Sequence, residues 1–351
     1  GLIDGVYADR TIVMDDVLES YDTVEAMVDS TYGLQLANVD KLATEFPNID
    51  GSGITVGVID TGFDATHPDL AGKLLAFKDL VNKKTAAYDD HGHGTHVSGT
   101  IAGGAASGTR IGLAPKAKIV AAKVFSSGGT GQDSNILAGM QFMLDPDGNP
   151  ATNDQPLIVS NSWGGPQKTE SLDAIPHQRM LQAWIKAGMV PVFAAGNSGA
   201  RGAGTVGTPG ALPLSFTVGA VDEAKAVTSF SSRGPVYWKI ADSKGNLVRT
   251  QFIKPDFAAA GKNVYSSMPG GKYGKMSGTS MATPHVAGIL ALVRQANPKL
   301  GVEDLRALLT KSSVDLGDKG KDNLSGFGLV DALAAVKTAK LTTPKTPKTP
   351  R

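Results

Sequence analysis

The chain alternates short runs of apolar, β-branched residues with longer amphipathic stretches over most of its length. Strands that pair in parallel need helical crossovers, so this alternation predicts an α/β fold with a mostly parallel central sheet and helices on both faces. The expected strands are residues 54–59, 119–125, 157–160, 190–195 and 216–221, and the expected helices are residues 92–102, 132–144, 172–187, 280–296, 302–310 and 329–338.

Bulk composition restricts the class of protein. The formal net charge is +1 over 351 residues, so the sequence points to no nucleic-acid partner. There is no cysteine, which excludes disulfides and thiol chemistry. A transmembrane helix needs a run of about 18 apolar residues, and the sequence holds no such run.

Three segments carry residues that could together activate a hydroxyl group. Asp60 directly follows an expected strand, His93 begins an expected helix, and Ser280 begins another after the small residues Gly278 and Thr279. Ligands of parallel sheets lie at the carboxyl ends of the strands, and a helix N-terminus favours developing negative charge. A serine hydroxyl is a weak nucleophile that needs a neighbouring base, which a histidine held by a carboxylate provides.

The order Asp60, His93, Ser280, inside the motifs Val-Ile-Asp-Thr-Gly, His-Gly-Thr-His-Val-Ser-Gly and Gly-Thr-Ser-Met-Ala-Thr-Pro-His, resembles the subtilisin-like serine proteases. The resemblance extends over about residues 32–340. It implies a serine endopeptidase in which Ser280 attacks the peptide carbonyl, His93 moves the proton and Asp60 holds the imidazole.

The resemblance also implies the residues around this triad. Asn197, after Gly196, matches the family's side-chain donor to the oxyanion. Gly207 matches the floor of the pocket for the residue before the cleaved bond (P1), which implies a roomy pocket that prefers large apolar side chains. Two segments match the edges that pair with an extended substrate: Gly129, Thr130 and Gly131, and Ser162, Trp163 and Gly164.

The chemistry requires no cofactor, and we expect no catalytic metal. His91, His93 and His96 are close in sequence, but a zinc site needs a further ligand and Asp60 is used elsewhere. Many relatives hold a structural calcium in the loop that here is residues 103–110. That loop has no acidic residue, so a structural calcium there has weak support. Two acidic pairs could support calcium elsewhere: Asp64 with Asp69, and Asp89 with Asp90.

Both ends differ from the expected catalytic domain, residues 29–340. Residues 5–14 are expected to form a strand that resembles the last strand of a subtilase propeptide, and residues 15–29 have a helical pattern. Residues 1–28 are therefore either a propeptide remnant that is cut off by the enzyme or a permanent extension. Residues 341–351 repeat Thr-Pro-Lys and are expected to be an extended linker or tail. Residues 236–253 are expected to form an added β-hairpin around Gly245.

The expected partners are protein or peptide substrates and the chain's own propeptide as inhibitor, with no nucleic acid and no membrane. We expect a secreted monomer. Two other functions stay open: a narrow processing protease or peptide ligase with the same chemistry, and a non-catalytic peptide-binding relative.

Overall fold

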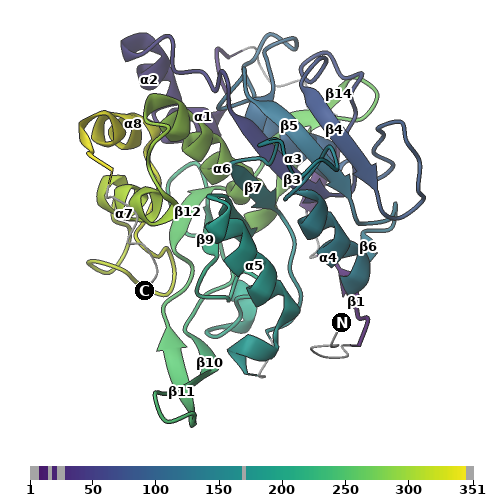
Figure 1. Cartoon of the computed structure of the whole chain (residues 1–351). Coiled ribbons are helices and arrows are strands. Elements are labelled where there is room, and N and C mark those ends of the chain that lie inside the picture. The colour runs from purple at the N-terminus through teal and green to yellow at the C-terminus, as the bar shows by residue number, and fades with distance from the viewer. Residues whose placement is uncertain (1–7, 15–17, 22–27, 168–170, 345–351) are drawn as a thin grey trace.

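A seven-stranded parallel sheet forms the centre of the molecule (Figure 1). The computed structural model describes residues 8–14, 18–21, 28–167 and 171–344. The strand order is β12-β9-β8-β7-β3-β5-β4, and every neighbouring pair is parallel. This confirms the predicted α/β class. The strands are β3 (Thr55–Asp60), β4 (Leu74–Asp79), β5 (Lys118–Lys123), β7 (Ile158–Asn161), β8 (Val190–Ala194), β9 (Phe216–Val221) and β12 (Phe257–Ala260).

Helices cover both faces of the sheet. On one face lie α3 (His93–Ala102) and α6 (Thr279–Ala296), and on the other lie α4 (Asp133–Phe142) and α5 (Pro176–Lys186) (Figure 1). Successive side chains of a strand point to opposite faces. Accordingly, Val58 of β3 joins the core beneath α3 and α6, whereas Ile59 joins the core beneath α4 and α5.

Four further helices pack on the α6 side of the sheet. The apolar residues of α7 and α8 belong to the same core as those of α6, and α8 contacts both α6 and α2. These helices are α1 (Tyr32–Leu36), α2 (Val39–Glu45), α7 (Val302–Ser312) and α8 (Ala332–Leu341). Two short 3₁₀ helices are η1 (Leu172–Ala174) and η2 (Gly199–Arg201).

Most predicted boundaries agree with the structure within two residues, but two helices differ. The helix expected over residues 172–187 is divided into η1 and α5, because Pro176 lacks the N–H that a continuous helix requires and starts α5 instead. The last helix begins at Ala332 rather than Leu329. The Asp331 carboxylate accepts a hydrogen bond from the Ala334 N–H at 2.9 Å and caps that start.

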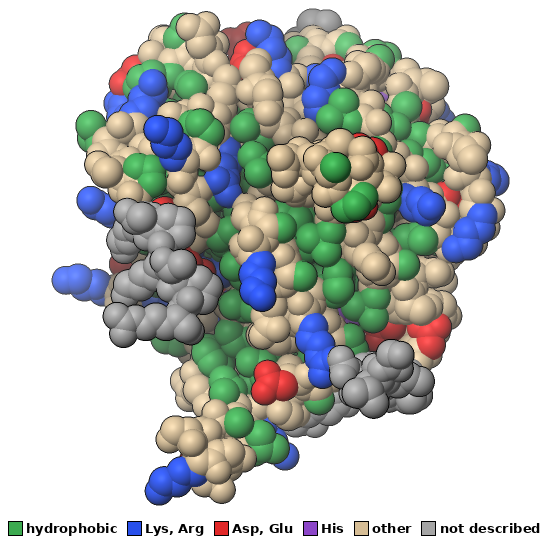
Figure 2. Space-filling view, in the orientation of Figure 1, with side chains coloured by type: hydrophobic (Ala, Val, Ile, Leu, Met, Phe, Trp, Pro, Cys, Tyr) green, Lys and Arg blue, Asp and Glu red, His purple; other side chains and the backbone are tan. Residues whose placement is uncertain are grey.

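The remaining strands form small antiparallel sheets. The predicted hairpin is confirmed as β10 (Val236–Ala241) paired with β11 (Leu247–Phe252), and it projects from the lower edge of the molecule (Figures 1 and 2). A three-stranded sheet contains β13 (Val264–Met268), β14 (Lys272–Ser277) and β2 (Leu18–Tyr21). The short strand β1 (Thr11–Val13) pairs with β6 (Thr130–Gln132).

The helical pattern predicted for residues 15–29 is wrong where the structure describes that segment. Leu18–Tyr21 is a strand that pairs antiparallel with β14. An edge strand such as β14 offers unpaired N–H and C=O groups, and pairing with it outweighs the weak local preference for helix. The strand expected over residues 5–14 is present at Thr11–Val13, whereas residues 1–7, 15–17 and 22–27 lie outside the described part.

Candidate active site

Asp60 and His93 form a buried hydrogen-bonded pair. Asp60 is the last residue of β3, near the middle of the sheet, and His93 is the first residue of α3. The Asp60 Oδ1 atom lies 2.8 Å from His93 Nδ1, and it also accepts the Thr61 N–H at 2.7 Å. The two side chains are 1% and 0% exposed, so the contact is shielded from water. The carboxylate fixes the orientation of the ring and places the proton on Nδ1.

Ser280 is the second residue of α6 and is almost buried. Its hydroxyl donates to the Ser162 carbonyl at 2.9 Å, and the Ser162 hydroxyl donates to the Ser280 carbonyl at 2.8 Å. This reciprocal pair joins the end of β7 to the start of α6. Because His93 bonds to the last residue of β3, and Ser280 bonds to the residue after the neighbouring parallel strand β7, both helix starts lie at the carboxyl end of the sheet.

The Asn197 side chain has a fixed orientation beside the same helix start. Its Oδ1 accepts hydrogen bonds from Thr279 N at 2.9 Å and Thr279 Oγ1 at 3.0 Å. Thr279 Oγ1 also accepts the Gly196 N–H at 3.0 Å. Since the amide is planar, these bonds direct Nδ2 away from Thr279, where it can donate to an oxyanion next to the Ser280 N–H. Sequence reasoning assigned no role to Thr279, although it orients the predicted donor.

The first predicted substrate-binding edge is already paired with a strand of the chain itself. Ile12 of β1 lies opposite Gly131 of β6, and the Met14 N–H donates to the Gly129 carbonyl at 2.9 Å. A Cβ at Gly131 would come within 2.7 Å of the Val124 carbonyl oxygen, so a side chain is excluded there. The edge of Gly129, Thr130 and Gly131 therefore binds an extended segment through main-chain groups.

The second edge follows β7. Trp163 is buried, and its indole N–H donates to the Ile59 carbonyl at 3.0 Å, which ties this segment to the strand of Asp60. Gly164 faces more open space, because the nearest atom to a Cβ there, the Thr208 carbonyl oxygen, would be 3.5 Å away.

A pocket of about 620 Å³ opens between this edge and the residues after β8. A Cβ at Gly207 would lie 2.7 Å from the Gly165 carbonyl oxygen, which is too close for a side chain. Glycine at position 207 therefore allows the two segments that line the pocket to approach each other closely. Gly196 also lines the pocket. On the side of the N-terminal segment, the pocket is lined by Ile12 of β1 and by Met14, the residue after β1. The structure thus brings Gly164, Gly196 and Gly207 to one pocket beside the substrate edges.

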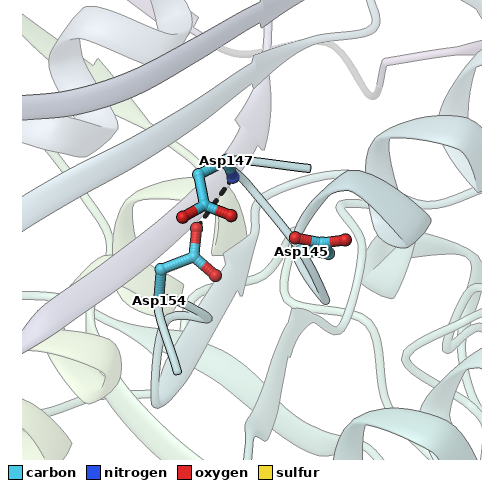
Figure 3. Close-up of side chains that lie close together, drawn as sticks. All are labelled: Asp145, Asp147 and Asp154. Carbon is cyan, nitrogen blue, oxygen red and sulfur yellow. Dashed lines mark hydrogen bonds between the residues drawn. The ribbon is translucent and has the colours of Figure 1, made fainter. Parts of the chain in front are cut away.

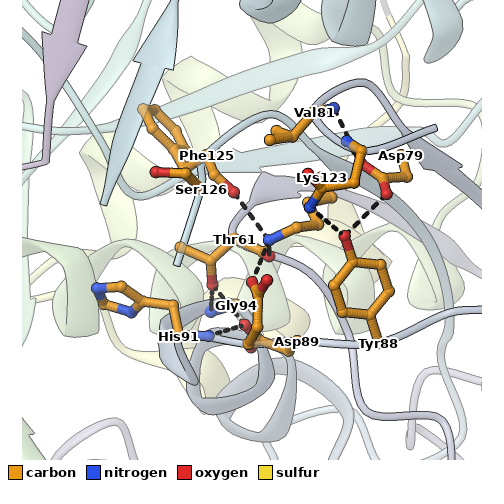
Figure 4. A network of polar contacts seen from close by, with 12 residues as sticks. Thr61, Asp79, Val81, Tyr88, Asp89, His91, Gly94, Lys123, Phe125 and Ser126 are labelled. Atoms are coloured by element: carbon orange, nitrogen blue, oxygen red, sulfur yellow. Dashed lines mark hydrogen bonds and ion pairs between the residues drawn. The ribbon is translucent and has the colours of Figure 1, made fainter. Parts of the chain in front are cut away.

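A polar network lies behind the Asp60–His93 pair (Figure 4). The Asp89 carboxylate accepts the Thr61 hydroxyl at 2.9 Å and the main-chain N–H groups of His91, Gly92 and Thr95. The Thr61 hydroxyl oxygen in turn accepts the Gly94 N–H at 2.9 Å. Asp89 therefore fixes the turn after Asp60 to the first turn of α3.

Lys123 completes this network from the end of β5. Its fully buried ammonium donates to the carbonyls of Thr61 and Phe125 at 2.5 and 2.9 Å, and it forms an ion pair with Asp90 at 2.5 Å (Figure 4). Phe125 begins the loop that leads to β6. One cation thus joins the turn after Asp60 to the substrate-binding edge, a connection that no sequence motif indicated.

Three further histidines, His67, His96 and His285, are held by main-chain carbonyls. His96 and His67 each contact a carbonyl through Nε2 at 2.9 Å, and His285 contacts the Met281 carbonyl through Nδ1 at 2.8 Å. Burial, together with the neighbouring His93, lowers the pKa of His96 to about 3, and burial lowers the pKa of His285 to about 4. His96 and His285 are therefore neutral near pH 7.

One acidic cluster is the only group of three potential metal ligands in the described part of the chain. Asp145, Asp147 and Asp154 have carboxylate oxygens within 4.8 Å of one another (Figure 3). The Asp147 N–H donates to Asp154, and the Thr152 hydroxyl donates to Asp147. The acidic residues that the sequence suggested as calcium ligands are used differently: Asp64 accepts from Thr66 and Gly270, Asp69 from Ala106 and Tyr273, Asp89 from main-chain groups, and Asp90 pairs with Lys123.

The buried carboxylate–imidazole pair, the serine at a helix start and the glycine-rich strand edge are features expected of a serine hydrolase. Residues 51–328 match the model of the subtilase family. The chain therefore belongs to the subtilase family. Members of this family are serine endopeptidases, and the chain belongs to that class of enzyme.

Named relatives have similar sequences over most of the chain. Bacillopeptidase F of Bacillus subtilis strain 168 is 37% identical over 313 residues, which are 82% of this chain and 21% of that protein. Serine protease AprX of the same organism is 36% identical over 338 residues, 88% of this chain and 71% of AprX. Subtilisin DY of Bacillus licheniformis is 33% identical over 307 residues, 87% of this chain and 98% of that protein. Within the described residues, every helix is too short or too polar to cross a membrane.

Proposed function

We propose that the chain hydrolyses peptide bonds with Ser280 as nucleophile, His93 as general base and acid, and Asp60 as the group that holds His93. The observation that carries this proposal is the buried hydrogen bond between Asp60 and His93 at the carboxyl end of β3. A fully buried imidazole held through Nδ1 by a carboxylate presents Nε2 to a proton donor and is stabilised when it becomes charged.

The reaction follows from these positions. Ser280 Oγ attacks the carbonyl carbon while its proton passes to His93 Nε2, and the carbonyl oxygen takes up the negative charge. Asn197 Nδ2 and the Ser280 N–H donate to that oxygen. The C–N bond then breaks as His93 gives the proton to the leaving amine. Water, activated by His93, hydrolyses the resulting ester and returns Ser280 to its starting state.

The chemistry uses no cofactor. The loop of residues 103–110 does not fit a calcium ion, because it supplies no carboxylate ligand. The nearby Asp69 carboxylate is already bonded to this loop, since its Oδ1 accepts the Ala106 N–H at 2.7 Å.

The substrate is a protein or peptide that lies in extended form between the two edges. The pocket bounded by Gly164 and Gly207 takes the P1 side chain, and its size and largely main-chain walls suit large apolar residues. Binding is therefore broad, since main-chain hydrogen bonds supply much of it.

The chain's N-terminal segment acts as an intramolecular inhibitor. β1 occupies the edge of Gly129, Thr130 and Gly131 as an extended substrate would, with Ile12 buried against the site. A second strand, Leu18–Tyr21, is bound at β14. Described residues on both sides of positions 15–17 are thus paired with the body of the enzyme, which supports the assignment of residues 1–28 as an inhibitory propeptide.

We also propose that the enzyme works outside the cell as a monomer, without nucleic-acid or membrane partners. The similarity to Subtilisin DY and Subtilisin Savinase supports the proposed location, and the net charge of +1 supports the lack of a nucleic-acid partner. Gel filtration and activity in the culture medium test both statements.

The decisive test is a fluorophosphonate probe combined with digestion of casein, applied to the parent chain and to Ser280→Ala. We expect the probe to label the parent chain and the parent chain to digest casein broadly. Ser280→Ala should not be labelled, and its kcat should fall about 10⁶-fold. Labelling without casein digestion would instead support narrow processing or peptide ligation. An unlabelled parent would support a peptide-binding protein without catalysis.

A further inference from the structure

The P1 pocket holds one charged side chain among the residues that the structure describes. One side of the pocket is formed by Thr11–Met14 of the N-terminal segment, and the rest is formed by glycines, by Pro166 and Gln167 and by the small polar residues Ser198, Thr205 and Ser232. Arg201, at the end of η2, also lines it. No described Asp or Glu side chain shares this lining.

The Arg201 guanidinium is available to a ligand. It forms no ion pair and no side-chain hydrogen bond with a described residue; the one bond that Arg201 makes there is from its main-chain N–H to the Ser198 carbonyl at 3.0 Å. By contrast, Arg233 nearby uses its guanidinium on the carbonyls of Thr228, Ser229 and Ser231. An unpaired cation at the wall of a half-enclosed pocket attracts a carboxylate and can bind it with two parallel hydrogen bonds.

The 3₁₀ helix η2 fixes the main chain that carries Arg201, whose side chain is exposed to solvent. It starts one residue after Ser198, which itself follows the oxyanion donor Asn197, and the Gly199 N–H donates to the Phe230 carbonyl at 2.7 Å. A Cβ at Gly199 would lie 2.0 Å from the Ser231 carbonyl oxygen, so the main chain is tightly packed there. Arg201 thus belongs to the same short segment as the proposed oxyanion donor Asn197, and this segment forms one wall of the pocket.

We propose that Arg201 makes this pocket accept acidic P1 residues, so that the enzyme cleaves after Glu and Asp as well as after large apolar residues. The inference rests on the proposed function, since it names a substrate class for the same site. Large apolar side chains fill the pocket by burial, whereas an acidic side chain of similar length is bound by its charge.

The chain's own sequence is consistent with this specificity. β1 is seated on the substrate edge and ends at Val13, Met14 donates to Gly129, and the next two residues in the sequence are Asp15 and Asp16. A cut after Asp15 or Asp16 would place an acidic side chain in the P1 pocket, whereas a cut after Met14 or Val17 would place an apolar one there.

The test compares three peptide substrates that differ only at P1, with Phe, Glu or Gln in that position. In the parent enzyme, the ratio of kcat/KM for Glu to that for Gln is expected to exceed one. In Arg201→Gln this ratio falls by about fivefold to tenfold, with kcat/KM for Glu reduced more than kcat/KM for Phe, and Arg201→Glu gains activity on a Lys substrate. The matched control Arg249→Gln removes the same charge from the hairpin, where Arg249 stacks on Tyr237, and leaves the ratio unchanged.

Each outcome has a separate meaning. An unchanged Glu-to-Gln ratio in Arg201→Gln, with full activity on Phe, overturns the role of Arg201 and leaves the peptidase assignment intact. No cleavage of any of the three peptides by the parent overturns the proposed function itself. The Glu preference should also weaken between about 0.15 and 1 M salt, because added salt screens the charge pair.

Discussion

Lys123 lies directly opposite Asp60 in the register of β3 and β5, and its fully buried ammonium is bonded to the carbonyl of the residue after Asp60. The same ammonium is bonded to the Phe125 carbonyl and to Asp90. A buried cation with these partners fixes the relative positions of the catalytic aspartate and the substrate-binding edge.

Replacing Lys123 should therefore impair turnover through geometry. Lys123→Met keeps much of the side-chain volume and removes the charge, which leaves Asp90 and two carbonyls without their donor. We expect kcat to fall at least about tenfold at a temperature far below the unfolding midpoint, with a smaller change in KM. Lys118→Met, at the exposed start of β5, is the control and should behave like the parent. Equal loss in both variants would show that Lys123 has no special role.

Asn197→Ala should lower kcat far more than it raises KM. The side-chain amide acts on charge that is present mainly in the transition state, so its loss costs about 10²–10³-fold in kcat. Thr279→Val should give a smaller loss, because it removes the hydroxyl that holds Asn197 Oδ1, whereas Thr279→Ser should restore activity. Steady-state kinetics on one peptide distinguish these cases. An unchanged kcat with a raised KM in Asn197→Ala would mean that Asn197 only positions substrate.

The parallel sheet, its strands β3, β5, β7, β8 and β9, and the motifs around Asp60, His93 and Ser280 could be predicted because local patterns encode them, whereas the edge strands β4 and β12 were not predicted. The boundary errors come from tertiary context. Leu18–Tyr21 is a strand only because β14 offers a free edge, and the helix expected from Leu172 is divided where Pro176 removes an N–H donor.

The parts of the site that sequence reasoning missed depend on contacts between distant segments. Lys123 looks like an ordinary charged residue at a strand end, and only its burial against Thr61 and Asp90 gives it a role. Likewise, Arg201 and Gly207 are six residues apart in a glycine-rich segment, and nothing in that pattern states that both line one pocket.

Stability should fall as the pH drops below neutral, in part because of His96 and His285. Their pKa values in the folded state are about 3 and about 4, well below the value of about 6.5 in an unfolded chain. Below about pH 6.5 the unfolded chain binds protons that the folded chain does not, so the free energy of unfolding decreases. For His285 the loss continues down to about pH 4.

Thermal unfolding of Ser280→Ala, which cannot digest itself, measures this effect between pH 7 and 4.5. Adding His285→Gln should reduce the proton uptake on unfolding near pH 5 by about one. A midpoint that stays constant from pH 7 to 5 contradicts the prediction.

Chelation by EDTA should lower the unfolding midpoint little, because residues 103–110 supply no carboxylate and the Asp69 carboxylate already accepts the Ala106 N–H. A fall of more than roughly 10 °C, which is several kcal/mol for a chain of this size, would contradict this. Asp147→Asn then identifies the source: if this variant no longer responds to EDTA, the cluster of Asp145, Asp147 and Asp154 holds the ion.

The N-terminal segment should be cut by the enzyme itself between Met14 and Leu18. A cut at the end of the proposed propeptide, residues 1–28, would instead give a new terminus near residues 29–32, in a segment that is held away from His93. The Asp29 carbonyl accepts the Arg110 N–H and the Thr31 N–H donates to the Arg110 carbonyl, beyond the end of α3 opposite His93. β1 lies on the substrate edge, and Met14, the next residue, lines the proposed P1 pocket, so the described residues favour a cut soon after Met14.

N-terminal sequencing of the active enzyme and of Ser280→Ala checks this. The active form should begin at one of residues 15–18, and the variant should keep Gly1. Gly131→Val is a second control, because a side chain there would contact the Val124 carbonyl and displace β1, so it should slow the cut. Gly1 retained in fully active protein would mean that the segment is a permanent extension, and a terminus at residues 29–32 would mean that the segment rearranges before it is cut.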